Sequence, residues 1–512
     1  MPRYAAIDIG SNSVRTLVAE VASGAPLRVL AADRQVTRLG ASVFRTGQIA
    51  QDSLEYVTSI LSRMAQTYRR LDVAGVRAVA TSAVRDARNQ SDFIRRASQA
   101  IDAPVEIISG QEEARLIHLG VQSLWPHPKK RVLLIDVGGG SAEITLSQDG
   151  VMDEAFSKPL GAVRLTEVFL KSDPPEPIEL HRMDEFIEQK LGSVVRRIGI
   201  GKFDRAIATS ASAAALVCAV NRIPRTRRDS ADRLRATTSQ ICKLYQDLST
   251  RNLAARRKIT GIGPRRAEII VPGAAVFKRV LEAFHLPSVY YCAAGVRDGI
   301  IADLAARRVG RELSRMDRDQ RAAVEELARR FGVPLKHARK VAALANEIFE
   351  SLAPLHKLPP FYGKMLDAAC YLRDIGHYIS DTSHHKHSSY VVVNSDLPSF
   401  TEQERRFIAV LCRYHRKSMP QPRHQEFQAL SPENQRAILY LSPILRLADG
   451  LDRTRDQRIE AVRCELRNGN VVVLIESAHD TGLEQWAAER VSENFRQVYD
   501  KNLSVARARR SA

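Results

Sequence analysis

One stretch of the sequence constrains the fold more than any other: residues 132–143, V-L-L-I-D-V-G-G-G-S-A-E. Its apolar, partly branched start predicts a buried strand, and the consecutive glycines after it allow close backbone contacts that a Cβ would forbid. The N–H groups of such a turn can converge on an anion. Asp136, Ser141 and Glu143 add the oxygen ligands that Mg²⁺ prefers. The alternative is a glycine-rich hairpin between two core strands.

The same pattern occurs a second time near the start of the chain. Residues 4–13, Y-A-A-I-D-I-G-S-N-S, again combine an apolar strand, an aspartate, a glycine and hydroxyl groups. Asp8 corresponds in kind to Asp136, and Gly10 to Gly138. Two such turns in one chain predict duplicated halves that face each other. A phosphate chain held between them would meet backbone amides from both sides, with a metal neutralising its charge.

These turns resemble the phosphate-binding loops of the superfamily that joins acetate and sugar kinases, heat-shock chaperone ATPases and actin. The pair D-I-G-S-N-S and D-V-G-G-G-S-A-E is similar to one branch, the exopolyphosphatase/guanosine pentaphosphate phosphohydrolase family. Other stretches that match this branch are A-T-S-A-V-R-D-A at 80–87, I-I-S-G-Q-E-E-A-R-L-I at 107–117, I-V-P-G-A-A at 270–275 and G-V-R-D-G at 295–299. The resemblance is close over the first part of the chain and looser beyond it.

The resemblance implies an α/β fold with two duplicated actin-like (ribonuclease H-like) subdomains that face a cleft. The alternation of strand-like and helical patterns agrees with it. We expect the boundary between the two halves in a loop that contains Pro126 and Pro128. The expected domains are actin-like subdomain I at 1–125, actin-like subdomain II at 126–305, an all-α domain at 310–457 and a small α+β unit at 458–512. In the last unit the sequence predicts a strand at 471–475, an amphipathic helix at 483–498 and a frayed basic tail at 507–510.

Two adjacent carboxylates, Glu112 and Glu113, open a predicted helix after a strand at 105–109. The helix dipole favours carboxylates in a first turn, so a purely structural role is the alternative. Adjacent helical residues point about 100° apart, so both cannot face one substrate. By resemblance Glu113 matches the family's catalytic glutamate, which implies that it orients and deprotonates the attacking water.

The resemblance also implies a phosphate site and a metal site. The residues expected to bind phosphate are Gly10, Ser11, Asn12, Ser13, Arg85, Gly138, Gly139, Gly140 and Ser141. A guanidinium such as that of Arg85 suits bidentate phosphate binding, although a surface salt bridge is an equal alternative on spacing alone. Asp136, Glu143 and Asp8 are expected to hold Mg²⁺ or another divalent cation.

A third loop near the phosphates carries glycines in relatives, but this chain reads A-T-S-A-S-A-A-A at 208–215. The departure argues against a contribution from Thr209, Ser210 or Ser212, and against a pocket for a nucleotide base. Arg297 is as compatible with a structural role as with a substrate-facing one.

Beyond about residue 310 the sequence resembles the metal-dependent phosphohydrolase fold named for its His-Asp (HD) doublet. The residues that carry this resemblance are His337, Asp374, the cluster His384, His385 and His387, His415 and Asp449. The doublet position reads Arg373-Asp374, and a permanent cation there would repel a divalent metal. We therefore expect a degenerate HD-like domain that binds substrate or supports a dimer, without a second catalytic site. His356 is expected to be a core histidine.

The net charge of +19 bears on partners. Arginines gather at 225–228, 256–258 and 265–266, and an inorganic polyanion fits the phosphate loops better than nucleic acid, whose sequence-specific binding is not expected. A solvated arginine-rich surface is the alternative. The chain carries no apolar run long enough for a membrane span and no signal peptide, and its cysteines form no C-x-x-C. We expect a cytoplasmic protein, and the resemblance implies a homodimer.

These features predict Mg²⁺-assisted hydrolysis of a terminal phosphoanhydride. Inorganic polyphosphate is the first expected substrate, with processive release of terminal phosphate by an exopolyphosphatase. Guanosine pentaphosphate (pppGpp), hydrolysed at its 5′ terminal phosphate, is the alternative, because relatives divide between the two. Two alternatives belong to another class of function. One is an ATP-binding kinase or chaperone-like module, and the other is a non-catalytic regulator that binds polyphosphate or the alarmone.

Overall fold

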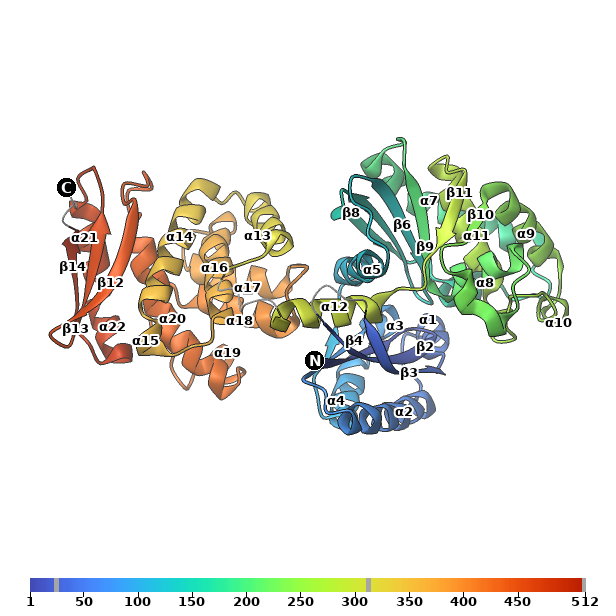
Figure 1. Ribbon diagram of the computed structural model, residues 1–512, viewed down its shortest axis with the longest axis horizontal. Coiled ribbons are helices and arrows are strands. Elements are labelled where there is room, and N and C mark those ends of the chain that lie inside the picture. Colours follow the sequence, from blue (N-terminus) through green and yellow to red (C-terminus); the bar gives the residue numbers. More distant parts are fainter. Residues whose placement is uncertain (23–26, 310–314, 509–512) are drawn as a thin grey trace. The chain divides into compact units, whose positions relative to one another are not determined.

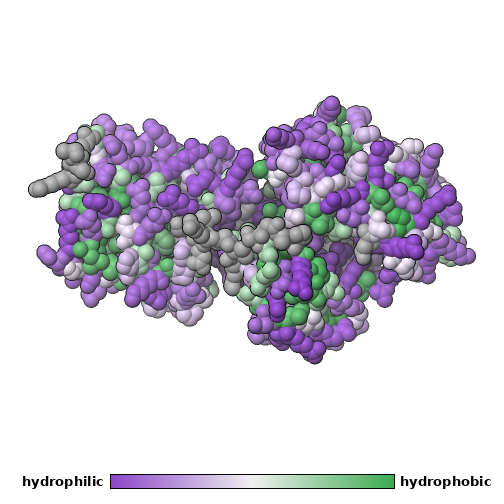
Figure 2. Space-filling model, in the orientation of Figure 1, coloured by the Kyte–Doolittle hydropathy of each residue, from purple (hydrophilic) through white to green (hydrophobic). Residues whose placement is uncertain are grey.

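The computed structural model describes residues 1–22, 27–309 and 315–508. The chain divides into two compact units, Met1–Val309 and Gly310–Ala512. The first unit contains two sheets with helices around them, and the second is mostly helical with one small sheet (Figure 1). Hydrophilic residues cover most of the face of each unit that Figure 2 shows. Within the described ranges, every helix is too short or too polar to span a lipid bilayer.

The first sheet of the first unit has five strands in the order β3-β2-β1-β4-β5. These strands are β1 (Arg3–Ile9), β2 (Ser13–Glu20), β3 (Arg28–Val36), β4 (Gly75–Ala80) and β5 (Val105–Ile107). β1, β2 and β3 pair antiparallel, whereas β1, β4 and β5 pair parallel. The central β1 is covered on both faces, which explains its unbroken buried run from Tyr4 to Ile7.

The second sheet repeats this arrangement, in the order β10-β11-β9-β6-β7-β8. These strands are β6 (Arg131–Val137), β7 (Ala142–Gln148), β8 (Val151–Lys158), β9 (Arg205–Thr209), β10 (Arg235–Thr237) and β11 (Ser288–Tyr291). β6, β7 and β8 pair antiparallel, β6, β9 and β11 pair parallel, and β10 adds an antiparallel edge. Five strands thus share one order and one set of directions with the first sheet, and the predicted duplication is confirmed.

Helices cover both sheets of the first unit. They are α1 (Leu39–Thr46), α2 (Gln51–Arg70), α3 (Ser82–Asp86), α4 (Gln90–Ile101), α5 (Gly110–Leu124), α6 (Ala162–Phe169), α7 (Pro177–Ile198), α8 (Ser210–Val220), the 3₁₀ helix η1 (Arg225–Ala231), α9 (Thr238–Thr250), α10 (Leu253–Arg256), α11 (Ile270–Ala283) and α12 (Val296–Val309). The first sheet shares a core with α2 and α4, and the second with α7, α8 and α11. α12 returns to contact α5 and β1, so the chain after the second sheet packs against the first (Figure 1).

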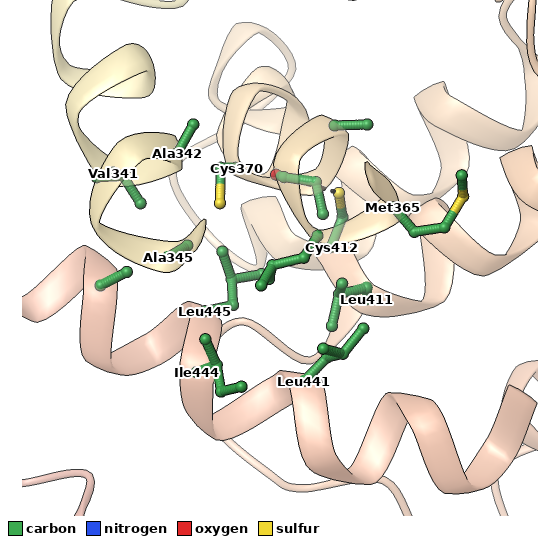
Figure 3. Close-up of a cluster of buried hydrophobic side chains, with 14 of the residues drawn as sticks. Val341, Ala342, Ala345, Met365, Cys370, Leu411, Cys412, Leu441, Ile444 and Leu445 are labelled. Carbon is green, nitrogen blue, oxygen red and sulfur yellow. Dashed lines mark hydrogen bonds between the residues drawn. The ribbon is translucent and has the colours of Figure 1, made fainter. Parts of the chain in front are cut away.

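The second unit is built around one core that joins helices and a sheet. Its helices are α13 (Arg318–Arg330), α14 (Leu335–Ser351), α15 (Ala353–His356), α16 (Phe361–Leu372), the 3₁₀ helix η2 (Ile375–Tyr378), α17 (His384–Asn394), α18 (Glu402–Arg413), α19 (Gln425–Gln428), α20 (Pro432–Gly450), α21 (Gly482–Glu489) and α22 (Ser492–Tyr499). Its strands, in the order β12-β13-β14, are β12 (Ala461–Arg467), β13 (Asn470–Glu476) and β14 (Leu503–Arg507). Figure 3 shows α14, α16, α18 and α20 meeting through side chains such as Val341, Cys370, Leu411 and Leu445. Buried residues of β12 and β13 belong to the same cluster, so the sheet packs on the helices.

Two features of the C-terminal segment differ from the sequence prediction. The helix expected over 483–498 is two helices, α21 and α22. Ala488, Val491 and Phe495 are all buried in the same core, so the apolar periodicity continues through the turn and conceals it. The basic tail expected to fray from Arg507 instead begins within β14, which pairs parallel with β13, and residues 509–512 lie outside the described residues.

Candidate active site

Two hairpins of identical hydrogen bonding carry the predicted phosphate loops. In the β1–β2 hairpin, the N–H of Gly10 donates to the carbonyl oxygen of Ser13 at 3.1 Å. In the β6–β7 hairpin, the N–H of Gly138 donates to the carbonyl oxygen of Ser141 at 3.0 Å. The two turns that resemble each other in sequence therefore have the same backbone pairing, one in each sheet.

The tips of these hairpins touch each other. A Cβ at Gly140 would lie 2.5 Å from the Oγ atom of Ser11 and 2.5 Å from the Oγ atom of Ser82. A Cβ at Gly139 would lie 3.1 Å from the backbone nitrogen of Asn12. Any side chain at Gly140 would push the loops apart, so glycine is required there by the close approach of the two halves.

A cavity of about 310 Å³ lies between the hairpins. The predicted residues that line it are Asp8, Gly10, Ser11, Asn12, Ser13, Glu113, Asp136, Gly138, Gly139, Gly140 and Ser141. The structure thus brings together groups from both sheets and from α5, although the role of each residue stays a prediction.

Two predicted residues, Arg85 and Glu143, lie beside the cavity instead of in its lining. The Oε1 atom of Glu143 accepts a hydrogen bond from the hydroxyl of Ser157 at 2.7 Å. The Nη1 atom of Arg85 donates to the carbonyl oxygen of Ile108 at 2.6 Å and lies 3.8 Å from the Oε2 atom of Glu113. Arg85 therefore faces the predicted general base, and the structure does not place it among the phosphate loops.

Four carboxyl groups lie close together beside the hairpins: Glu113 and Glu143, which are buried, and Asp8 and Asp136, which are half-buried. Burial raises the pKa of Glu113 well above its usual value, and the charge of Glu143 raises it further against the opposing effect of Arg85. Burial also raises the pKa values of Asp8 and Asp136, and burial together with Asp136 raises the pKa of Glu143 to about 7. The Oε2 atoms of Glu113 and Glu143 have no hydrogen-bond partner among the described residues. Carboxylate oxygens are the ligands that a divalent cation such as Mg²⁺ prefers, so this cluster fits the predicted metal.

Glu112, the neighbour of Glu113, points into a buried network of charges. Its Oε2 atom accepts from Nε of Arg115 at 2.7 Å, and its Oε1 atom accepts from Nη2 of Arg77 at 3.0 Å. Asp303 accepts from the same two arginines at 3.0 and 3.1 Å. Because this network joins β4, α5 and α12, it fixes the rotation of α5 about its axis, and the adjacent Glu113 faces the cavity.

The cavity also has a wall of arginines, most of which sequence reasoning missed as site residues. The members are Arg15, Arg34, Arg228, Arg266 and Arg297. Within the described part of the chain, none of them forms an ion pair with a carboxylate. Burial and the other arginines lower the pKa values of Arg34 and Arg266 to about 9. A prediction of the strand register would have placed Arg15 and Arg34 at the site. They are paired in line with Asp8 across β1, β2 and β3.

The segment without glycines, 208–215, also reaches the site, which corrects the expectation from sequence. The hydroxyl of Thr209 donates a hydrogen bond to Oδ2 of Asp136. Ser210 lines the cavity with a φ of 84°, a left-handed conformation that favours glycine. The hydroxyl of Ser212 accepts from Nη1 of Arg266 at 3.3 Å. The glycines are absent, yet the backbone keeps the conformation that glycine would adopt.

In the second unit, Arg373 occupies the centre of the predicted HD-like cluster. Its Nη2 atom lies 2.6 Å from Oδ1 of Asp449, 2.6 Å from Nε2 of His337 and 3.4 Å from Oδ2 of Asp374. The guanidinium thus lies among these three side chains, and the assignment of a degenerate HD-like domain stays a prediction. His356 is fully buried and hydrogen-bonded to the carbonyl of Phe349, so its expected core position is confirmed.

Two halves with one strand order, each contributing a glycine-containing hairpin to a shared cavity, define the class of actin-like proteins that includes the sugar kinases. Within that class, the chain belongs to the Ppx/GppA phosphatase family, whose model matches residues 17–308. The model of Ppx/GppA phosphatase domain III matches residues 320–486.

Solved structures agree with this assignment. The chain is 29% identical to the Aquifex aeolicus member of the Ppx/GppA family, with a TM-score of 0.52 over 60% of this chain and 98% of that chain. It is 27% identical to a protein described as exopolyphosphatase-like, with a TM-score of 0.57 over 60% of this chain and 99% of that chain. An exopolyphosphatase from Cytophaga hutchinsonii, 22% identical, shares the fold with a TM-score of 0.54 over 59% of this chain and 97% of that chain.

Proposed function

We propose that this protein is an exopolyphosphatase that hydrolyses the terminal phosphoanhydride of inorganic polyphosphate. The observation that carries the proposal is the lining of the cavity, which combines a cluster of carboxyl groups with five arginines that form no ion pair with a carboxylate among the described residues. Arginines that lower one another's pKa values are stabilised by an anion. A chain of phosphates supplies this negative charge, and its terminal group would lie between the two hairpins.

The cluster of carboxyl groups would hold the metal. Asp8 and Asp136 line the cavity, and Glu143 lies behind them, so these oxygens are the expected ligands of Mg²⁺. When bound, the ion offsets the charge that spreads over the transferring phosphoryl group. The amides of the two glycine turns would then position the terminal phosphate, since phosphoryl transfer depends mainly on positioning and electrostatics.

Glu113 is the proposed general base. Glu113 lines the cavity, and its Oε2 atom is buried without a hydrogen-bond partner among the described residues, so the carboxyl group keeps the capacity to accept a proton from a water molecule bound in the site. Burial raises its pKa, which brings the group closer to the operating pH and makes it a stronger base. Arg85, 3.8 Å from the carboxylate, opposes this shift and keeps the ionised form accessible.

The arginine wall continues beyond the first cavity, and this favours a polymer over a nucleotide. A second cavity of about 400 Å³ shares Arg34, Arg228 and Arg266 with the first and adds Arg225 and Arg265. Among the described residues that line the second cavity, none is aromatic. A guanine base would find no ring on which to stack there, whereas further phosphates of a polymer would find guanidinium groups.

The test is orthophosphate release with Mg²⁺ from four substrates: long-chain polyphosphate, short-chain polyphosphate, pppGpp and ATP. We expect the highest kcat/KM with long chains. Glu113→Gln should lower turnover about a hundred- to ten-thousand-fold while substrate binding persists. Glu185→Gln, on an exposed face of α7, is the matched control and should leave turnover unchanged.

A second pair of variants tests whether the substrate is a polymer. Arg225→Ala and Arg265→Ala, in the second cavity only, should raise KM for long chains and leave pppGpp hydrolysis unchanged. Preference for pppGpp over every polyphosphate would overturn the substrate assignment. Near-normal turnover by Glu113→Gln, or transfer of phosphate from ATP to an acceptor, would overturn the mechanism.

A further inference from the structure

Helix α6 contacts the glycine turn of the second half from outside the cavity. The carbonyl oxygen of Gly138 accepts a hydrogen bond from the N–H of Ala162 at 3.0 Å. The carbonyl oxygen of Gly139 accepts from the N–H groups of Val163 at 2.9 Å and Arg164 at 3.1 Å. The three donors belong to the first turn of α6, and none of them is among the described residues that line the cavity. The glycine turn therefore lies between α6 and the cavity.

These hydrogen bonds set the direction of the amides in the turn. The peptides are trans, and the C=O and N–H groups of a trans peptide point in opposite directions. A carbonyl of Gly138 that faces α6 therefore directs the N–H of Gly139 away from this helix, and the carbonyl of Gly139 does the same for the N–H of Gly140. Neither N–H donates to a backbone carbonyl of the described residues. The amides expected to bind phosphate are thus oriented by the helix behind them.

The first half has a similar arrangement around α1. The carbonyl oxygen of Ser11 accepts from the N–H of Gly40, in the first turn of α1, at 2.7 Å. The carbonyl oxygen of Asn12 accepts from the N–H groups of Thr37 at 3.1 Å and Arg38 at 3.2 Å, which directly precede α1. Because α1 and α6 each follow the third strand of their half, both copies of the turn are held by the start of the helix at the same place in the repeat.

One peptide of the second turn is held by a side chain. The Nε atom of Arg164 donates to the carbonyl oxygen of Gly140 at 2.7 Å. This carbonyl shares its peptide with the N–H of Ser141, which points in the opposite direction and so away from the guanidinium. Ser141 lines the cavity, whereas Arg164 is not among the described residues of the lining. The guanidinium therefore lies behind this peptide, as the first turn of α6 lies behind the two peptides before it.

The same guanidinium reaches the first half of the unit. Its Nη2 atom donates to the hydroxyl of Ser82 at 3.0 Å and to Oδ2 of Asp86 at 2.5 Å. Ser82 and Asp86 begin and end α3, and Ser82 lines the cavity. The Cζ atom of Arg164 lies 4.0 Å from the centre of the ring of Phe44, in α1. Because a guanidinium is planar and its donors have fixed directions, Arg164 fixes the carbonyl of Gly140 relative to α1 and α3.

We propose that Arg164 is a positioning residue of the phosphate site, which holds the N–H of Ser141 in the orientation that a bound phosphoryl group requires. The inference rests on the proposed function, but Arg164 itself does not contact the substrate. N–H donors that are oriented in advance stabilise the charge of a transition state without reorganisation. Loss of the guanidinium should therefore lower kcat. It should change KM little, because the other amides of the turns and the wall of arginines still bind the phosphate chain.

Kinetics with long-chain polyphosphate and Mg²⁺ test this role. Arg164→Ala and Arg164→Lys should both lower kcat about ten- to a hundred-fold, because lysine keeps the charge without the planar fork. Free guanidinium ion, below denaturing concentrations, should restore part of the kcat of Arg164→Ala. Arg197→Ala, which removes an exposed ion pair with Glu154 in the same unit, is the matched control and should keep the kcat of the parent chain. A rise in KM at unchanged kcat, or a loss of kcat that follows a fall in unfolding temperature and resists guanidinium, would overturn the inference.

Hydrogen exchange gives a readout that does not depend on turnover. With orthophosphate and Mg²⁺ as the probe, we expect slower exchange of the N–H groups of residues 139–141 in Glu113→Gln. Addition of Arg164→Ala to this variant should abolish that protection. Protection that persists in the double variant, or that neither variant shows, would overturn the inference. Loss of protection in the double variant, from a parent chain that releases no phosphate from any polyphosphate, would support the inference and overturn the proposed function alone.

Discussion

Arg15 and Glu143 occupy the same position in two copies of one hairpin. Arg15 pairs with Asp8 across β1 and β2 in the register in which Glu143 pairs with Asp136 across β6 and β7. The duplicated halves thus share a backbone but differ in charge at one position. The first half presents a cation beside its aspartate, and the second presents another carboxylate.

This difference predicts separate effects for the two side chains. Arg15→Ala removes a charged donor from the cavity lining, which should cost about 1.5–3 kcal/mol of phosphate binding. We expect KM for polyphosphate to rise about 10–100-fold with Mg²⁺ affinity unchanged. Steady-state kinetics at several Mg²⁺ concentrations checks this. A loss of Mg²⁺ affinity in Arg15→Ala that exceeds the rise in KM for polyphosphate would contradict this prediction.

Glu143 makes stability depend on pH. Its pKa is raised to about 7 in the folded chain, so between its usual value near 4.3 and pH 7 the folded state binds more protons than the unfolded state. The free energy of unfolding should therefore fall as pH rises through this window when no divalent cation is present. Thermal unfolding from pH 4.5 to 8 checks the slope, which Glu143→Gln should reduce. Addition of Mg²⁺ should offset the loss most strongly near pH 7 and above.

A substitution in the network around Glu112 should lower the free energy of unfolding, whereas a substitution at the adjacent Glu113 should lower turnover. Asp303→Asn removes a buried charge that faces Arg77 and Arg115, and breaking such a pair costs about 3–5 kcal/mol. We expect urea unfolding to show this loss. Glu113→Gln, one residue from the network, should instead lose turnover with little loss of stability, because it removes a buried carboxylate whose charged form is already disfavoured. Equal stability of Asp303→Asn and the parent chain would show that the network does not hold α5.

Ser210 offers a test of backbone strain at the site. Its φ of 84° is costly for a residue with a Cβ, but its hydroxyl accepts hydrogen bonds from the N–H groups of Ser212 at 3.2 Å and Ala213 at 3.3 Å. Ser210→Gly removes the strain and the hydrogen bonds together, so we expect nearly unchanged stability. Ser210→Ala keeps the strain and loses the hydrogen bonds, and should be destabilised by about 1 kcal/mol. Greater loss in the glycine variant than in the alanine variant would contradict this account.

Much of this site could be predicted from the sequence because its two turns are formed by residues that are adjacent in the chain. The turns at Gly10 and Gly138 each close within a few residues, so their aspartates, glycines and hydroxyls are adjacent in the chain. The duplication of the two halves follows from the same repeat. The direction of Glu113 away from Glu112 follows from helical geometry alone.

The rest depends on contacts between distant segments. Arg15 and Arg34 reach the cavity because of strand register, and Arg228 and Arg266 because α8 and the segments after it fold over the second sheet. Nothing in the local sequence shows that these arginines lack carboxylate partners. The same limit applies to Ser210, since a backbone angle set by the surrounding fold overrides the preference of the residue that adopts it.

The contact between Gly140 and Ser11 also determines how the first unit can flex. Because the hairpin tips already touch, a rotation of one half against the other must pivot near them, and atoms far from a pivot move more than atoms close to it. The carboxylates beside the tips, and Arg15 next to Asp8, would keep their spacing during such a motion. A rotation of the two halves would therefore leave the spacing of the proposed metal ligands unchanged.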